Sequence, residues 1–225
     1  MGQINKLKDF TRGQLDSALM KIGQDAGMGT ADGIRAFLAG ELVVSKPARR
    51  WGEKEGGNII CFSLTTNGLT GRQWIKRFEK LGIKLSDYAK SLLLSPDFKP
   101  TKAGVTIPIE VLKGQLFTDE DRTTTNIRAS ADKRGLTKPN AEIACLIRET
   151  FSDKEIEAMG LTWIITMHEP INDSDGDPLL LGARRYDDRP WLGACCVKPG
   201  DRWHRSRGFA FVASPVPPTA GRVAS

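Results

Sequence analysis

The chain has 225 residues, 40% hydrophobic and 27% charged, and it carries a formal net charge of +6. This is an ordinary globular composition, and a chain of this length can bury a core without disulfide staples. The basic balance favours anionic partners such as nucleic acid or an acidic surface. The sequence has no secretion signal and no apolar run of about 18 residues, so we expect a cytoplasmic protein without a membrane span.

The cysteine and histidine pattern is not that of a metal site. Among the 4 cysteines, no two have the C-x-x-C spacing of zinc ligands, and the 2 histidines lie far apart. Adjacent cysteines such as Cys195 and Cys196 rarely bond to each other, because the resulting ring is strained. We therefore expect reduced thiols, no metal and no cofactor.

Residues 1–50 are predicted to be a small helical segment and a linker. Apolar side chains recur at roughly helical spacing over 4–22. Thr30 or Asp32 can then cap a short helix that ends at Gly40. The basic stretch that follows contains proline and several glycines, which is typical of a flexible connection.

The next elements carry clear local signals. The stretch 58–65, NIICFSLT, is a continuous apolar run between turn signals, which predicts a buried strand. Thr70 can then cap a helix, and Ser86 or Asp87 can cap a second helix that stops before Pro96.

These two helices admit two interpretations. As a helix-turn-helix unit they would face phosphate groups with their lysines. As a structural unit, they would bury Trp74, Tyr88 and their leucines and leave the lysines solvated. The structural interpretation is favoured, because the second helix offers little beyond Lys90 for reading bases.

The segment 105–112 is apolar, and Pro108 leaves it open between a strand and the start of a helix. Thr118 precedes consecutive carboxylates, which predicts a helix N-terminus. That helix would run to about Arg134, and its polar composition on nearly all sides places it outside the core.

Further on, Pro139 can occupy the first turn of another helix, and Ser152 with Glu155 can form the capping box of a short one. The alternating apolar residues of 161–168 predict a second buried strand.

The C-terminal part has a different texture. From 173 to 212 no helical period remains, so we expect loops, with short strands at 190–197 and 207–212. The proline-rich tail over 215–225 is predicted to be disordered.

Asp173, Asp175 and Asp177 could surround a calcium ion. However, Gly176 precedes the third aspartate and the glutamate of an EF-hand is missing, so a capped turn of the Asx type is favoured.

His168 beside Glu169 invites an acid–base interpretation, and Cys195 or Cys196 could act as a nucleophile with His204. Nothing in the sequence orients either set, and no established catalytic motif occurs. We therefore expect a structural His168 and a protein that is not an enzyme.

Arginines alternate with aromatic residues through 184–207. Tyr, Trp and Arg dominate the hot spots of binding surfaces. We interpret Trp191, Trp203 and the phenylalanines of the last strand as scaffold residues. The residues between them are interpreted as the ones displayed to a ligand.

The spacing W-L-x-A-x-x-x-x-P-x-x-R-W-x-x-x-x-G-F-A-F-V over 191–212 resembles the variable segment of target proteins of diversity-generating retroelements. The stretches FSLTTNGLTGRQWIKRFEK and TWIITMHEPINDSDGDP are similar to an uncharacterised protein family of candidate-phylum bacteria. The resemblance implies an α+β chain with a C-type-lectin-like domain over 57–214. In such a domain the first and last strands pair, here 58–65 with 207–213, and two helices follow the first strand.

The resemblance also implies that adenine-directed mutagenesis of AAY codons changes the positions between the scaffold residues, which should then hold residues with NNY codons. Lys198 does not meet this condition, and no asparagine occurs after Asn172. The positions predicted to contact a ligand all meet it: Gly182, Arg184, Tyr186, Pro190, Gly193, Cys195, Cys196, Val197, Gly200, His204, Ser206 and Arg207.

The sequence thus predicts a display protein that binds a macromolecule, in the first place another protein, through a diversified C-terminal surface. The alternative is a basic nucleic-acid-binding protein that uses the helices within 72–90 and the arginine-rich C-terminus.

Overall fold

The computed structural model describes residues 29–39, 41, 49–186, 189–198 and 200–214, together with Ser17 and Met20. The chain divides into two compact units, Met1–Arg49 and Arg50–Ser225. In the first unit, the predicted short helix is α2 (Thr30–Leu38). The helical pattern predicted over 4–22 lies almost wholly outside the described residues, as does the predicted disordered tail.

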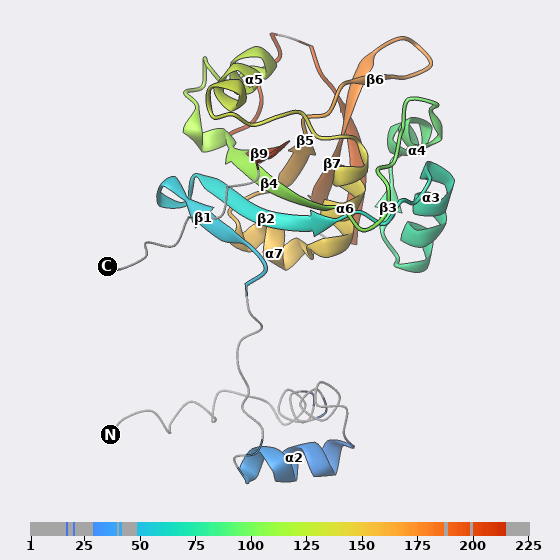
Figure 1. The fold of residues 1–225 in the computed structure, drawn as a ribbon, viewed down its shortest axis with the longest axis vertical. Coiled ribbons are helices and arrows are strands. Elements are labelled where there is room, and N and C mark those ends of the chain that lie inside the picture. Colours follow the sequence, from blue (N-terminus) through green and yellow to red (C-terminus); the bar gives the residue numbers. More distant parts are fainter. Residues whose placement is uncertain are drawn as a thin grey trace, which may run out of the picture. The chain divides into compact units, whose positions relative to one another are not determined.

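The second unit is built on one mixed sheet, which has nine strands in the described part of the chain (Figure 1). The strands follow the order β1-β2-β4-β9-β5-β7-β8-β3, and β6 pairs with β7. The pairs β5–β9 and β3–β8 are parallel and the others antiparallel. The strands are β1 (Gly52–Lys54), β2 (Ile59–Thr65), β3 (Lys84–Leu85), β4 (Thr106–Lys113), β5 (Trp163–Thr166), β6 (Ile171–Asn172), β7 (Pro178–Tyr186), β8 (Arg189–Cys196) and β9 (Arg207–Val212).

The chain is therefore of the α+β class, as predicted. Its remaining helices are α3 (Gly71–Lys80), α4 (Asp87–Leu94), α5 (Thr124–Lys133), α6 (Glu142–Thr150) and α7 (Asp153–Ala158), with short 3₁₀ turns η2 (Glu55–Gly57) and η3 (Gly114–Leu116). Predicted caps are confirmed: the Ser86 hydroxyl accepts from the N–H of Ala89 at 3.1 Å, and Ser152 forms a capping box with Glu155. None of the described helices is both long and apolar enough to span a bilayer.

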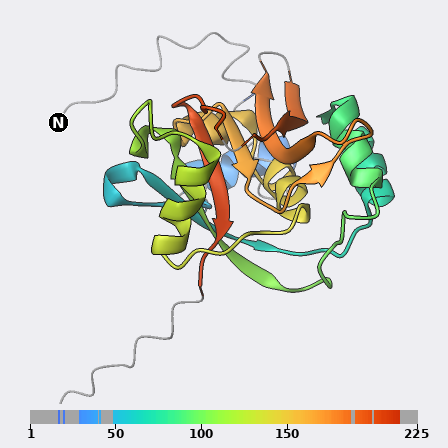
Figure 2. The same cartoon turned by 90° about the horizontal axis from the view of Figure 1, so that it is seen from above.

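Side chains alternate between the two faces of the sheet along each strand, and each face carries its own core cluster. In β5, Ile164 belongs to a large core cluster that includes residues of α3, α4, α6 and α7. Trp163 and Ile165 belong to a smaller cluster, which α5 covers through Ile127 and Ala131. Figures 1 and 2 show α3 and α4 side by side at the β3 end of the sheet, with β1 at the opposite end.

The predicted helix after 118 differs from the observed one at its start. Helix α5 begins only at Thr124, because the preceding Thr123 provides the cap and its hydroxyl accepts from the N–H of Asn126 at 3.3 Å. The prediction that this helix lies outside the core is also wrong, since Ile127 is fully buried on its inner face.

Some other local predictions were also wrong. Pro139 precedes α6 instead of occupying its first turn, and Tyr88, expected in the core, has 58% of its surface exposed. The strands at 190–197 and 207–212 are confirmed as β8 and β9. The expected loops over 173–212, however, include the long strand β7, whose Leu180 and Leu181 are fully buried.

The predicted pairing of the first and last strands is also corrected. Strand β2 pairs with β4, and it is β4 that pairs with β9. The ambiguous segment around Pro108 is thus a central strand. Pro108 is tolerated there because its backbone faces the β9 side, where its carbonyl accepts from the N–H of Ala213 at 2.9 Å and β9 begins to pair with β4 only at Ile109.

Arg148 joins three elements inside this fold. It lies on α6 with a relative exposure of 2%, and its guanidinium forms an ion pair with Asp153 of α7 at 2.7 Å. It also donates to the backbone carbonyls of Phe151 and, at 3.1 Å, of Arg184 on β7. Burial lowers the pKa of Arg148, which is the expected consequence of taking a charge out of water.

We expect Arg148→Met to lower the free energy of unfolding by about 3 kcal/mol, because Asp153 and the backbone carbonyls lose their buried partner. The control Arg50→Met removes the more exposed ion pair with Glu155, so it should cost less than about 1 kcal/mol. Urea denaturation of both variants measures the difference, and equal losses would contradict this account of Arg148.

Candidate ligand-binding face

Four side chains form a row across adjacent strands on the face of the sheet that α5 covers in part. The backbone register places Trp191 of β8 opposite Arg184 of β7. It also places Trp163 of β5 opposite both Arg184 and Arg207 of β9. Residues directly opposite in neighbouring strands share one face, so indole and guanidinium groups alternate along the row. We call these four residues the Trp–Arg row.

Each arginine of the row lies beside two aromatic rings. The guanidinium carbon of Arg184 is 5.0 Å from the ring centroid of Trp163 and 4.3 Å from that of Tyr186. The guanidinium carbon of Arg207 is 5.0 Å from Trp163 and 5.3 Å from Trp203. Each such cation–π contact stabilises by about 0.5–2 kcal/mol, more as water is excluded. Trp163 thus holds both arginines in place.

The indole of Trp163 lies against a pair of glycines. Gly182 of β7 and Gly193 of β8 are opposite each other in the next row. A Cβ at Gly182 would overlap the indole nitrogen and lie 2.7 Å from the carbonyl oxygen of Ile164, whereas a Cβ at Gly193 would lie 3.4 Å from the indole. The ring can therefore lie over the sheet only because Gly182 has no side chain.

The positive charge of the row has no neutralising partner among the described residues. No carboxylate in the described part of the chain forms an ion pair with Arg184 or Arg207. Burial lowers the pKa of Arg207, and the like charge of Arg184 acts in the same direction. Beside them opens a hollow of about 230 Å³, lined by Thr162, Trp163, Arg184, Arg185, His204, Ser206 and Arg207.

Several positions predicted to contact a ligand meet at this hollow. They are Arg184, His204, Ser206 and Arg207, with Tyr186 next to Arg184. The imidazole of His204 accepts from the N–H of Ser206 at 3.3 Å, and the hydroxyls of Ser206 and Thr162 are 2.8 Å apart. These bonds attach the segment before β9 to the start of β5.

Other predicted contact positions lie elsewhere. Three of them are buried in this structure and do not lie on its surface: Gly182, Gly193 and Val197. Cys196 packs against the large core cluster on the opposite face, and Pro190 lines a different hollow. Gly200 is exposed in the segment between β8 and β9.

Cys195 lies near the row but is not poised as a nucleophile. Burial raises the pKa of its thiol to about 12, despite the nearby charges of Arg207 and Arg184. The thiol is therefore protonated at neutral pH and only weakly reactive. His204 is engaged with Ser206, which fits the expectation that the cysteine and the histidine do not act as a catalytic pair.

His168 is a structural residue, as predicted. Its Nε2 accepts from the N–H of Leu181 at 2.9 Å, so its Nδ1 carries the proton and donates to the carbonyl of Glu169 at 2.6 Å. Burial lowers its pKa to about 4. The neutral ring connects the end of β5 to β7 and does not serve an acid–base site.

The aspartate loop is a capped turn, which was the favoured interpretation. The carboxylate of Asp173 accepts from the N–H groups of Asp175 and Asp177, both at 3.0 Å. No cluster of potential metal ligands occurs among the residues that the structure describes.

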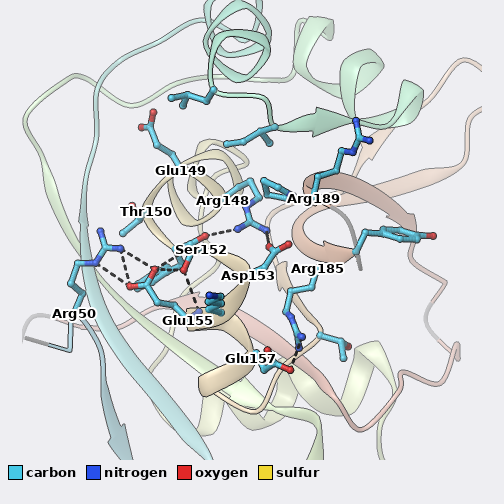
Figure 3. A pocket seen from close by; sticks show the side chains of 17 residues that line it. Arg50, Arg148, Glu149, Thr150, Ser152, Asp153, Glu155, Glu157, Arg185 and Arg189 are labelled. Atoms are coloured by element: carbon cyan, nitrogen blue, oxygen red, sulfur yellow. Dashed lines mark hydrogen bonds and ion pairs between the residues drawn. The ribbon is translucent and has the colours of Figure 1, made fainter. Parts of the chain in front are cut away.

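A larger hollow, of about 850 Å³, lies beside α6 and α7 (Figure 3). Charged side chains on its wall neutralise one another in ion pairs: Arg50 with Glu155 at 2.8 Å, Arg148 with Asp153 at 2.7 Å and Arg185 with Glu157 at 2.9 Å. This hollow is larger than the one beside the Trp–Arg row but offers little net charge to a ligand.

The helix-turn-helix interpretation of α3 and α4 gains no support from the packing. Trp74 and Phe78 of α3 are fully buried, and Arg77 forms an ion pair with Glu149. The two helices therefore pack their apolar residues into the core, as the structural interpretation predicted.

Comparisons with protein-family models, curated proteins and solved structures give no match for this chain. Fold and site together define a coarse class: an α+β domain with a large mixed sheet and a cationic, aromatic face. The residue types of this face stand out in the sequence, but Trp163 does not, because its place beside Arg184 and Arg207 depends on strand register.

We expect Gly182→Ala to reduce the free energy of unfolding by about 1–3 kcal/mol, because the added methyl group displaces the indole of Trp163. Gly193→Ala is the matched control and should cost less, since its Cβ would be in ordinary contact with the ring. Chemical denaturation followed by tryptophan fluorescence compares the two. An equal or larger loss in the control would show that Trp163 does not depend on Gly182.

We expect His168 to make the fold sensitive to acid. Its pKa is about 6.5 in the unfolded chain and about 4 in the folded one, so between these values the unfolded state binds more protons. The full stability above pH 6.5 should fall by about 3 kcal/mol as the pH drops to 4. Urea denaturation at several pH values should show a smaller loss in His168→Gln, while the exposed-site control His204→Gln should behave like the parent.

Proposed function

We propose that this chain is a non-enzymatic binding protein whose diversified C-terminal surface binds a macromolecular ligand, in the first place another protein. One observation carries the proposal: residues of β7, β9 and the segment before β9 converge on Trp163. Arg184 comes from a different part of the sequence than His204 and Arg207, but all three line one hollow. Clustered Arg, Tyr and Trp side chains on a rigid surface are the usual anchors of binding interfaces.

We further propose a C-type-lectin-like architecture, in a revised assignment. The strand that pairs with the last one is β4, and helices α5, α6 and α7 follow it. Strands β5 to β8 come next, before β9 closes the sheet between β4 and β5. This order supports the proposal, because β4, in place of the expected 58–65, pairs with the last strand and helices lie between the two in the sequence.

The exposure of the candidate positions supports diversification at some and restricts it at others. Tyr186 has 47% of its surface exposed, and Gly200 and His204 are also exposed. Substitution at exposed sites away from caps and networks changes stability by only about 0.5 kcal/mol. Gly182 and Val197 are buried, so variation there would act on the fold before it acted on a ligand.

Natural variation tests diversification directly. Sequencing the C-terminal coding segment in many cells should show substitutions at the codons of Tyr186, Gly200 and His204 and none at Trp163 or Gly182. A near-copy of the segment, differing at adenines and lying beside a reverse transcriptase gene, is expected. Substitutions spread evenly over the segment would count against the proposal.

A second test measures tolerance and binding in the protein itself. In a surface-displayed library with NNY codons at Tyr186, Gly200 and His204, we expect most members to stay folded within about 1 kcal/mol of the parent. Selection on immobilised streptavidin should then enrich binders. The matched library, at the exposed positions Arg72, Lys76 and Lys80 of α3, should yield none. Equal enrichment from both libraries would mean that the surface around the Trp–Arg row has no special role in binding.

A further inference from the structure

We propose that the hollow lined by Arg184 and Arg207 binds one anionic oxygen group of a protein ligand, a carboxylate or a phosphoryl group. The inference rests on the proposed binding function, because it takes the surface around the Trp–Arg row as the one that contacts the ligand. It adds the kind of chemical group that this surface binds.

The first argument is the charge of the hollow. Arg184 and Arg207 both line it, and no carboxylate of the described residues forms an ion pair with either of them. Both side chains are half-buried, so their charges are screened less than those of arginines in open water. An anion in the hollow would relieve the repulsion between the two guanidinium groups.

The second argument is preorganisation. Contacts with Trp163, Tyr186 and Trp203 hold the two guanidinium groups in place, and Trp163 is itself held against Gly182. A cation–π contact leaves a guanidinium group N–H donors for hydrogen bonds, and its planar fork matches the paired oxygens of carboxylates and phosphoryl groups. Little conformational entropy is then lost on binding.

The third argument concerns size and surroundings, which favour a discrete anion over a nucleic acid. The hollow has a volume of about 230 Å³, which suits one small group. A carboxylate flanks it, because Glu157 forms an ion pair at 2.9 Å with Arg185, which lines the hollow. A continuous phosphate backbone would meet this carboxylate on its way across the face.

The aromatic rings support the same conclusion. Single-stranded nucleic acid binds through free ring faces on which bases stack. Here Trp163 is contacted by both guanidinium groups, and Trp203 is buried with an exposure of 5%. The rings of the row therefore serve the arginines and leave few faces for bases.

The experiment titrates the labelled full chain with blocked tripeptides whose central residue is glutamate, phosphoserine or glutamine, and follows the indole N–H of Trp163 by NMR. We expect saturable shifts with the two anionic peptides, with dissociation constants on the order of a millimolar, and none with the glutamine peptide. The stronger of the two anionic peptides identifies the preferred group.

Two variants locate the site. Arg207→Gln should weaken binding about tenfold or more, because a charge-assisted hydrogen bond is lost. Arg207→Lys, which keeps the charge without the planar fork, should fall between this variant and the parent. The control Arg72→Gln removes an equal charge from α3 and should leave binding unchanged. Thermal melting checks that each variant is folded.

Several outcomes would overturn the inference. One is equal shifts in Arg207→Gln and the parent, and another is tighter binding of an oligothymidylate than of either anionic peptide. A third is binding that appears only when Asp187 and Asp188 are replaced by asparagine, since the chain would then fill its own site. Streptavidin binders from the displayed library, found without anionic-peptide binding, would leave the proposed function standing and refute this inference alone.

Discussion

The packing of the Trp163 indole against Gly182 is the constraint on which the candidate site depends. It places a large ring over Gly182 and Gly193, where the ring extends the smaller core cluster towards the surface. The same ring holds Arg184 and Arg207 on neighbouring strands. Core and site are therefore not separate parts of this molecule, because one side chain belongs to both.

The two hollows differ in electrostatics as well as in volume. The one beside α6 and α7 has paired charges on its wall, and Arg148 is held there by bonds within the chain. In the other, Arg184 and Arg207 lie over aromatic rings and have no carboxylate partner among the described residues. Buried volume alone would favour the first as a site, whereas the balance of charge favours the second.

Elements with complete local signals could be predicted from the sequence, and those that depend on distant pairing could not. Strand β2 has an apolar run between turns, and α7 has a capping box at Ser152. Strand β7 was missed because Gly182 and the arginines interrupt its apolar pattern, although the sheet buries its first half from both faces. Its arginines are accommodated by partners on other elements, because Arg184 lies over the ring of Trp163 and Arg185 pairs with Glu157. Register between strands creates the Trp–Arg row, and local sequence does not contain that register.

The position of β9 makes the folding of the domain depend on its last strand. This strand lies between β4 and β5 and connects β1-β2-β4 with β5-β7-β8-β3. During synthesis, the edges of β4 and β5 that pair with β9 stay unpaired until Arg207–Val212 has left the ribosome. A chain whose C-terminal segment cannot form this strand keeps two unpaired edges and is exposed to proteolysis and aggregation. The topology thus makes completion of the sheet depend on the part of the chain that shapes the candidate face.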